Sequence, residues 1–354
     1  MRINSLLILC AFLLMGCAEN TDHTASTKKG SESPEQQELN LTVTHSFVTD
    51  TNEHYRGLEI HDKVAVIGGS QGNILVYDFK LDSLRIFFTA EGIHIRDIDK
   101  ISDGSHTALG ITQPAQILFR DMPSDSFIVV FEGKDSLMFL DGIDFWENEY
   151  GIAFGDPIDG YPLVLFRELY DKTWSRVKEV DFPKEASNYA GFAASGTSIK
   201  CLPNGVAIIG LGNETAKVLR TPDYGMTWDL IDVPFHKEPN GTGIYSMAFK
   251  DSLNGVAVGG HWQNVTCDSS KIYTTDGGLS WHLSEGVQEY RSCVTYYKDD
   301  VYISTGTTGT DISYDGGKSW QLLDTIGYNA IAFQKDGTGI AVGSYGRITL
   351  LELK

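Results

Sequence analysis

The chain lacks an excess of positive charge. Its 28 lysine and arginine residues are outnumbered by 47 aspartate and glutamate residues, which gives a formal net charge of -19. Nucleic acids and anionic lipid surfaces are bound by basic faces, so this balance argues against a nucleic-acid-binding protein. An acidic surface instead favours solubility or a cationic partner.

Cysteine is also scarce, with five residues in a chain of 354. Cys201, Cys267 and Cys293 lie outside the N-terminal region and form neither a CxxC motif nor a Cys/His cluster. Since no nucleotide-binding fingerprint is present either, we expect no metal site and no cofactor. In an oxidising compartment one pair could form a disulfide. Cys267 with Cys293 is the favoured pair because both fall in adjacent repeats, and three buried thiols are an equally good interpretation.

The N-terminal apolar run is short. Residues 6–14 (LLILCAFLL) follow Arg2 and are too few to span a bilayer as a helix, but they suit a signal peptide. The run ends in the tetrapeptide Leu-Met-Gly-Cys at residues 14–17, which resembles the bacterial lipobox. The resemblance implies a lipoprotein signal peptide over residues 1–16 and acyl chains on Cys17, which would anchor the protein stably. An ordinary signal peptide followed by a chance cysteine is the alternative.

Residues 18–38 show no apolar periodicity and are rich in Glu, Ser, Thr and Lys. Such a composition cannot build a core, so residues 17–38 are predicted to form a lipidated, disordered tether. The expected location is the bacterial cell envelope, with the protein facing the periplasm or the cell surface.

From residue 39 onward the sequence contains strand-like runs and turn dipeptides, without a convincing long helix. Residues 221–228, 274–281 and 313–320 share the pattern [ST]-x-D-x-G-x-[ST]-W, which resembles the Asp-box, or BNR repeat. The Asp and the hydroxyl residue can accept backbone N–H groups in a hairpin turn, the Gly allows a positive φ, and the Trp packs between sheets. These residues are therefore assigned a structural role: Asp223, Gly225, Trp228, Asp276, Gly278, Trp281, Asp315, Gly317 and Trp320.

Weaker copies of the pattern close at residues 84, 127 and 174, so that consecutive copies lie 39 to 54 residues apart. A four-stranded propeller blade has about this length. The last repeat supplies three strands before the chain ends, and residues 39–47 can supply the fourth, which would remove an open sheet edge. The prediction is an all-β, seven-bladed β-propeller over residues 39–354, with Asp-box hairpins and an N-terminal strand that joins the last blade.

Several stretches resemble a known family, the photosystem II stability/assembly factor-like propellers in their bacterial, non-photosynthetic branch. They include residues 55–58 (YRGL), 139–146 (FLDGIDFW), 155–157 (GDP) and 290–293 (YRSC), and the resemblance covers roughly residues 40–354. It implies a binding scaffold that helps to assemble a membrane complex. It does not imply that photosystem II is the partner.

Propellers usually bind ligands at one mouth of the central channel. Internal alignment of the seven expected inner strands gives a polar residue at the middle position each time, and these residues are predicted to form a ring: Arg56, Arg96, Asp141, Ser195, Ser246, Arg291 and Asn329. With Asp97 and Asp144, the ring would bind an anionic or polar group, because arginine suits bidentate carboxylate contacts. The alternative is a ring that only solvates a water-filled channel.

An enzyme is the competing class, since Asp-box propellers include sialidases. Arg56, Arg96 and Arg291 could form an arginine triad, Tyr290 or Tyr297 could be the nucleophile, and Asp97 or Asp141 could be the acid. The early Arg-Ile-Pro signature of sialidases is absent, and no Glu is obviously placed beside a candidate Tyr. The favoured interpretation is a monomeric, membrane-anchored, extracytoplasmic scaffold for a protein or envelope complex. The alternative is a sialidase-like glycosidase that acts on glycans.

Overall fold

The computed structural model describes residues 38–354, except for residues 122–123, 125, 148, 169–171 and 178–181. The predicted signal peptide, Cys17 and all but the last residue of the predicted tether lie outside the described residues. Residues Leu39–Lys354 form one compact unit. Its described part consists of strands, turns and the short 3₁₀ helices η2 (Lys184–Asn188) and η3 (Pro203–Gly205). Within this part, no helix has the length and apolar character needed to cross a membrane.

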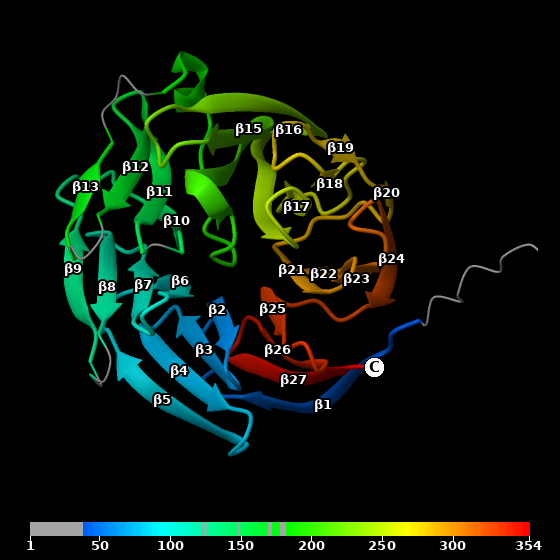
Figure 1. Cartoon of the computed structure of the whole chain (residues 1–354). Coiled ribbons are helices and arrows are strands. Elements are labelled where there is room, and N and C mark those ends of the chain that lie inside the picture. Colours follow the sequence, from blue (N-terminus) through cyan, green and yellow to red (C-terminus); the bar gives the residue numbers. More distant parts are fainter. Residues whose placement is uncertain (1–37, 122–123, 125, 148, 169–171, 178–181) are drawn as a thin grey trace, which may run out of the picture. The chain divides into compact units, whose positions relative to one another are not determined.

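Most strands pair antiparallel with the next strand in the chain, and the sheets surround a central opening (Figure 1). Three sheets have four consecutive strands each. The first contains β2 (Tyr55–His61), β3 (Val64–Gly69), β4 (Asn73–Asp78) and β5 (Ser83–Thr89). The second contains β6 (Ile95–Lys100), β7 (His106–Gly110), β8 (Gln116–Arg120) and β9 (Ile128–Glu132). The third contains β10 (Leu140–Phe145), β11 (Gly151–Ile158), β12 (Tyr161–Arg167) and β13 (Trp174–Arg176).

The remaining sheets are less uniform. The fourth contains β14 (Ile199–Leu202), β15 (Val206–Thr221), β16 (Asp229–Phe249), β17 (Gly255–His261), β18 (Lys271–Thr274) and β19 (His282–Leu283). The fifth contains β20 (Glu285–Gly286), β21 (Cys293–Lys298), β22 (Val301–Gly306), β23 (Gly309–Ser313) and β24 (Ser319–Asp324). The sixth contains β1 (Leu41–Val48), β25 (Ala330–Phe333), β26 (Thr338–Val342) and β27 (Arg347–Leu353).

The described strands therefore form six sheets, and the prediction of seven blades is wrong. The difference arises at β15 and β16, which are 16 and 21 residues long. They pair with each other from Arg220↔Asp229 through to Gly212↔Gly243, and β16 then continues into its pairing with β17. Two repeats that the sequence separates thus share one six-stranded sheet. The β-propeller class itself is confirmed.

The ring closes through the N-terminal strand, as predicted. Strand β1 pairs antiparallel with β27 from Leu41↔Leu353 to Val48↔Arg347. Figure 1 shows β1 beside β27 at the C-terminus. Because β27 would otherwise be an open edge, this pairing removes a strand edge that could join another chain.

The core lies between neighbouring sheets. One apolar cluster joins Ile152 and Phe154 of β11 to Ala207 and Ile209 of β15, all nearly inaccessible to solvent. A middle strand with a sheet packed on each side must bury both of its faces, and all seven residues of β17 are buried. This is why these strands are continuous apolar and glycine runs instead of alternating patterns.

The three turns with the Asp-x-Gly pattern have the same hydrogen bonds. In the second, Asp276 accepts the backbone N–H and the hydroxyl of Ser280 at 2.9 and 2.6 Å, and the hydroxyl of Thr274 at 2.8 Å. The indole N–H of Trp281 donates to the carbonyl of Gly278, whose φ is +81°. Asp223 and Asp315 have the equivalent partners. The aspartates hold turns, and the tryptophans pack in the core.

The three cysteines of the propeller are free thiols, so the favoured Cys267–Cys293 disulfide is not formed. The Sγ atom of Cys293 contacts the carbonyl of Ile331 on the sixth sheet, whereas the Sγ atom of Cys267 contacts the carbonyl of Asn264. The two thiols therefore face different neighbours. Cys201 is partly exposed, so the alternative of three buried thiols holds only for the other two.

Candidate functional site

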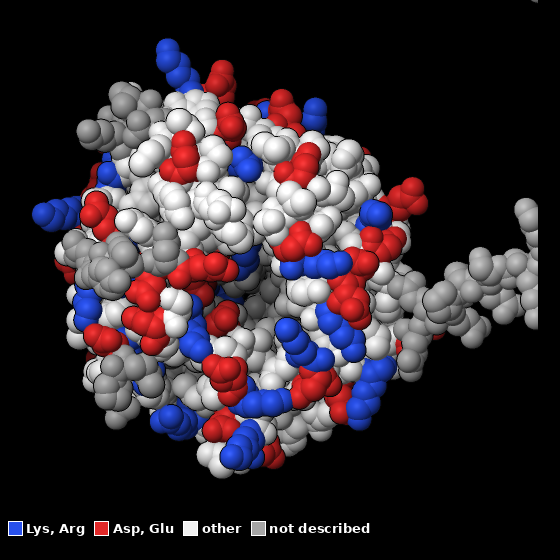
Figure 2. Space-filling view, in the orientation of Figure 1, with Lys and Arg blue, Asp and Glu red and all other residues white. Residues whose placement is uncertain are grey.

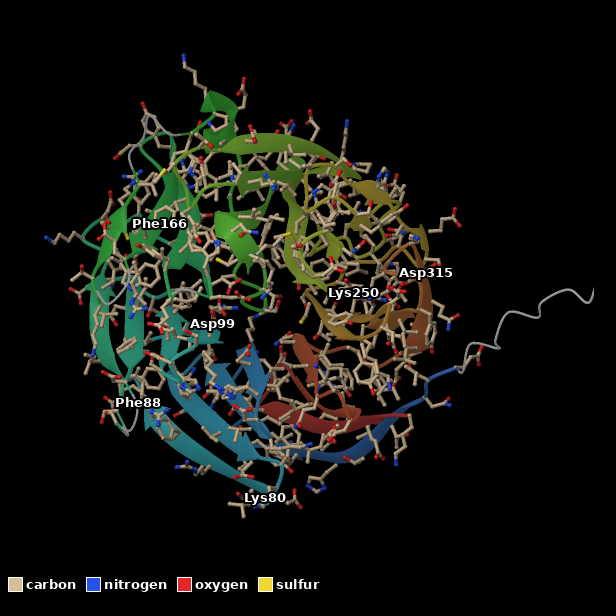
Figure 3. The ribbon with its side chains drawn as sticks, viewed as in Figure 1. Lys80, Phe88, Asp99, Phe166, Lys250 and Asp315 are labelled. Carbon is tan, nitrogen blue, oxygen red and sulfur yellow. The ribbon has the colours of Figure 1, made fainter. Side chains whose placement is uncertain are left out.

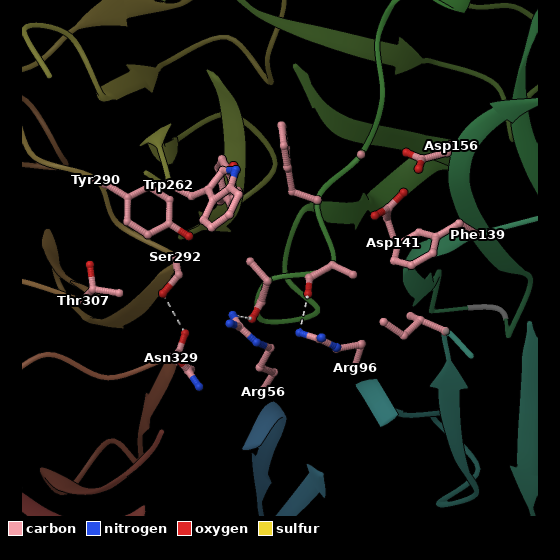
Figure 4. Close-up of a pocket in the computed structure, with 16 residues that line it drawn as sticks. Arg56, Arg96, Phe139, Asp141, Asp156, Trp262, Tyr290, Ser292, Thr307 and Asn329 are labelled. Carbon is pink, nitrogen blue, oxygen red and sulfur yellow. Dashed lines mark hydrogen bonds between the residues drawn. The ribbon is translucent and has the colours of Figure 1, made fainter. Parts of the chain in front are cut away.

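A cavity of about 490 Å³ lies at one mouth of the central channel. The space-filling view shows the hollow at the centre of this face, with charged side chains of both signs around it (Figure 2). Four of the nine predicted binding residues line the cavity: Arg56, Arg96, Asp141 and Asn329. They come from β2, β6, β10 and the residue before β25, so four different sheets contribute to one site (Figure 4).

A β-bulge aims three of these side chains at the cavity. The pairing of β2 with β3 passes from Tyr55↔Gly69 to Gly57↔Gly68, which leaves Arg56 without an opposite residue. The same shift leaves Arg96 unpaired in β6 and Asp141 unpaired in β10. A bulged residue is released from the alternation of the strand, so its side chain can turn toward the channel. The inner strands thus repeat one local distortion around the mouth.

The structure shifts the predicted ring by one residue in two places. In β16 the register passes from Ile244↔Gly259 to Ser246↔Val258, so Tyr245 is the bulged residue and lines the cavity instead of Ser246. Ser246 is buried and bonds to Val294 N–H. Ahead of β21, Ser292 lines the cavity in place of Arg291. The signal that could have found these positions is the glycine of the partner strand that faces each bulge.

Arg291 and Ser195 serve packing between sheets. Arg291 is fully buried and makes two bonds to the carboxylate of Asp311, at 2.7 and 2.9 Å. The hydroxyl of Ser195 donates to the backbone carbonyl of Ser292 at 2.8 Å. Neither lines the cavity.

Asp97 and Asp144 lie on the inner strands, away from the residues that line the cavity. Asp97 accepts the N–H of Ile143 at 2.8 Å, and burial raises its pKa to about 8. Asp144 accepts the N–H of Cys201 at 2.7 Å. They share the channel with Glu59, Asp99 and Lys200, whose charges influence one another; Figure 3 shows Asp99 near the centre of the ring. The contacts of these two aspartates connect neighbouring inner strands.

Arg56 and Arg96 are the cationic part of the cavity. Within the described residues each donates to a backbone carbonyl alone, Arg56 to Ala194 at 3.2 Å and Arg96 to Ala193 at 3.4 Å. No ion pair of either side chain is found within the described residues, and the Nε atom of Arg96 is buried without a partner. Burial lowers the pKa of both, that of Arg96 to about 10 with the nearby Arg56 contributing. Both still carry a charge at neutral pH.

Aromatic rings form another part of the wall. The rings of Phe192 and Tyr245 stack with centroids 4.0 Å apart, and Tyr290 meets Tyr245 edge-on at 5.0 Å. Trp262 lies at the rim and is 52% exposed. An exposed tryptophan above an aromatic wall offers apolar contact area to a ligand while its N–H remains free to bond. The sequence pointed to Tyr290 only as a candidate nucleophile of the glycosidase alternative, and it did not point to Phe192 or Tyr245 as site residues.

The residues that the glycosidase alternative requires do not all lie at the cavity. Of its proposed arginine triad, Arg56 and Arg96 line the cavity, whereas Arg291 is occupied by Asp311. Tyr290 lines the cavity, but burial raises its pKa to about 12, which opposes formation of a nucleophilic phenolate. Tyr297 packs in the apolar core with Phe333. Among the residues that the structure describes, no group of His, Cys, Asp and Glu is arranged to hold a metal ion.

Fold and site together define a β-propeller with a cavity of charged and aromatic side chains at its central mouth. No protein-family model and no curated protein sequence matches the chain. Solved propellers match its structure. YCF48 from Cyanidioschyzon merolae has a TM-score of 0.63 and 11% identity, over 88% of this chain and 98% of that one. The WD40 propeller domain of Doa1 has a TM-score of 0.61 and 10% identity, over 88% and 97%. U3-55K has a TM-score of 0.62 and 11% identity, over 88% and 98%. At these identities the likeness shows the fold alone.

Proposed function

We propose that this protein is a lipid-anchored scaffold of the bacterial cell envelope that holds a partner protein through its central cavity. Arg56 and Arg96 bind a carboxylate of that partner, and the rings of Tyr245, Tyr290 and Trp262 contact the residues beside it. One observation carries the proposal. Two adjacent guanidinium groups, in a chain of net charge -19, point into a cavity and have no carboxylate of their own among the described residues.

Physical reasoning favours an anion at this position. Two like charges in a partly desolvated site repel each other, and a bound carboxylate relieves this repulsion while it accepts several N–H groups in a bidentate geometry. Buried pairs of this kind dominate the affinity of many interfaces, and arginine and aromatic residues are typical of them. The resemblance to photosystem II assembly factor-like propellers supports a partner that belongs to a membrane complex.

The proposal is tested by capturing partners from the native envelope with the wild-type chain and with single variants. Arg56→Gln and Arg96→Gln should each weaken retention of the captured protein by about tenfold or more, because each removes one charged hydrogen-bond donor pair. Arg85→Gln is the matched control, since Arg85 is exposed on β5 and lies outside the cavity. Equal retention by all three variants would overturn the proposal, provided that their melting temperatures match the wild type.

A further inference from the structure

A pair of carboxyl groups forms an acidic part of the same cavity. Asp141 comes from the bulge of β10, and Asp156 comes from β11 of the same sheet. Both line the cavity, and Figure 4 shows their side chains close together, apart from Arg56 and Arg96. Asp141 is 1% exposed, whereas Asp156 is only partly buried. A ligand in the cavity can therefore reach Asp156 directly.

The hydrogen-bonding capacity of this pair is not used up. Asp141 accepts the backbone N–H of Ala193 and meets the side chain of Asp156, while its buried Oδ2 atom has no further hydrogen-bond partner among the described residues. Arg96 lies near enough to influence the pKa of Asp141, yet it donates to the carbonyl of Ala193 instead. Buried acceptors without a donor are rare and costly, so this oxygen needs either a proton shared with Asp156 or a donor from a bound ligand.

The backbone of Gly191 lies close against this oxygen. A Cβ atom on Gly191 would lie 2.5 Å from the Oδ2 atom of Asp141. Any side chain at this position would therefore collide with the carboxylate or displace it. The N–H of Gly191 also donates to Asp156, which holds the second carboxylate beside the first.

The charge of the pair is set by its burial. Burial raises the pKa of both carboxyl groups, that of Asp141 well above its ordinary range, and the negative charge of Asp156 adds to the effect on Asp141. Two carboxyl groups this close to each other oppose the presence of two negative charges at once. The cavity thus has a cationic part and an anionic part within a volume of about 490 Å³.

We propose that Asp141 and Asp156 bind an ammonium group of the same ligand whose carboxylate binds Arg56 and Arg96. The inference rests on the proposed function and adds its second contact. The ligand is a dipolar peptide segment that carries both an ammonium and a carboxylate group, with an apolar part against the aromatic wall. The two charges can come from the free termini of a short peptide or from lysine and acidic side chains within a longer segment.

Binding of short peptides to the full chain, measured by calorimetry, tests this inference. The first probe is the tripeptide Gly-Phe-Gly with free termini, compared with its N-acetyl form and its C-terminal amide form. The second is N-acetyl-Lys-Phe-Glu-amide, which presents the two charges from side chains, compared with N-acetyl-Gln-Phe-Glu-amide. Tighter binding of the first set identifies the free termini as the source of the two charges. Tighter binding of the second set identifies side chains of an internal segment.

For the set that binds, removal of the ammonium group should weaken binding to the wild type by about tenfold. Asp156→Asn should weaken binding of the charged probe by a similar factor, and removal of the ammonium should then have no further effect. Asp159→Asn is the matched control. Asp159 is exposed in the turn between β11 and β12, and its φ of +56° suits asparagine. The Asp159→Asn variant should bind the probe with the ammonium group and the probe without it as the wild type does.

The results separate a failure of this inference from a failure of the proposed function. If the ammonium makes no difference while Arg56→Gln still weakens binding of the carboxylate, no ligand donor completes Asp141, and only this inference is overturned. If none of the probes binds, or if Arg56→Gln has no effect on those that bind, the proposed function fails as well. Asp156→Asn is preferred over a change at Asp141 because Asp156 is only partly buried and lies outside the inner strand β10.

Discussion

Arg291 and Asp311 form a two-bond ion pair in which both side chains are completely buried. Lys271 joins the same carboxylate at 3.0 Å and is equally buried. Two cations therefore share one carboxylate between the fourth and fifth sheets, with Glu289 at 3.3 Å from Arg291 on the solvent side. The desolvation of such a group is costly, and its charges are tolerated only while they remain paired.

Replacement of Asp311 by asparagine should destabilise the fold strongly. The variant leaves the buried Arg291 and Lys271 without their common counter-charge, and loss of one member of a buried ion pair costs about 3–5 kcal/mol. Urea denaturation should show a lower midpoint. Asp300→Asn is the control, because its pair with Lys250 is largely exposed and should contribute less than about 1 kcal/mol. Equal effects of the two variants would contradict this assignment.

The buried amine of Lys271 should make stability depend on alkaline pH. Burial lowers its pKa to about 8, and the charge of Arg291 adds to this against the opposing effect of Asp311. In the unfolded chain the amine titrates near its ordinary value of 10.5. Between these values the unfolded state holds a proton that the folded state has released, so stability rises with pH, and below about pH 8 the full penalty is present.

Lys271→Met isolates this effect. The wild type should gain stability relative to the variant by on the order of 2 kcal/mol between pH 8 and 10, because only the wild type carries the titrating amine. Urea midpoints of both proteins across this range provide the measurement. Parallel curves for the two proteins would show that the amine of Lys271 titrates at its ordinary pKa.

The turn of Asp276 should be a local source of stability. Asp276→Ala removes the acceptor of three hydrogen bonds and should lower the free energy of unfolding by about 1–2 kcal/mol. Burial alone would raise the pKa of Asp276, but the bonds from Ser280 and Thr274 outweigh it and lower the pKa. The difference from the wild type should therefore be present at neutral pH and be lost as the pH falls through this lowered pKa.

The control for this turn is Asp232→Ala, since the side chain of Asp232 is 91% exposed and forms a surface pair with Lys217. Thermal unfolding should show a change of less than about 0.5 kcal/mol for this variant. If Asp276→Ala behaves like the control at neutral pH, the turn bonds contribute nothing to folding.

The hairpin turns were predictable because their chemistry is local. Asp276, Gly278 and Trp281 lie within six residues of one another, and their partners belong to the same turn. The closing role of β1 was predictable from the number of strands, since the last repeat supplies three strands and a blade has four. The number of sheets was not, because the pairing of β15 with β16 depends on long-range register, and no local residue marks where one sheet ends.

The residues that line the cavity were predicted only in part for a similar reason. Polar residues on the inner strands are visible in the sequence, but a bulge moves the cavity-lining position by one residue. Tyr245 replaced Ser246 in this way, and the ring of Phe192 that stacks on it was not predicted as a site residue. Asp156 was quoted for its resemblance to the family and was missed as a site residue, because only the folded sheet places it beside Asp141.

Closure by β1 provides the last prediction. Leu39, Leu41 and Phe47 pack on an apolar cluster that the first, fifth and sixth sheets form, and the backbone of β1 pairs with β27 along its length. Deletion of residues 1–48 would expose the edge of β27 and uncover this part of the core, so we expect a lower melting temperature and concentration-dependent aggregation. Deletion of residues 1–37 leaves β1 in place and should retain the melting temperature of a chain with all 354 residues. Scanning calorimetry with light scattering compares the two. A monomeric protein of unchanged stability after the longer deletion would show that the ring stays closed without its N-terminal strand.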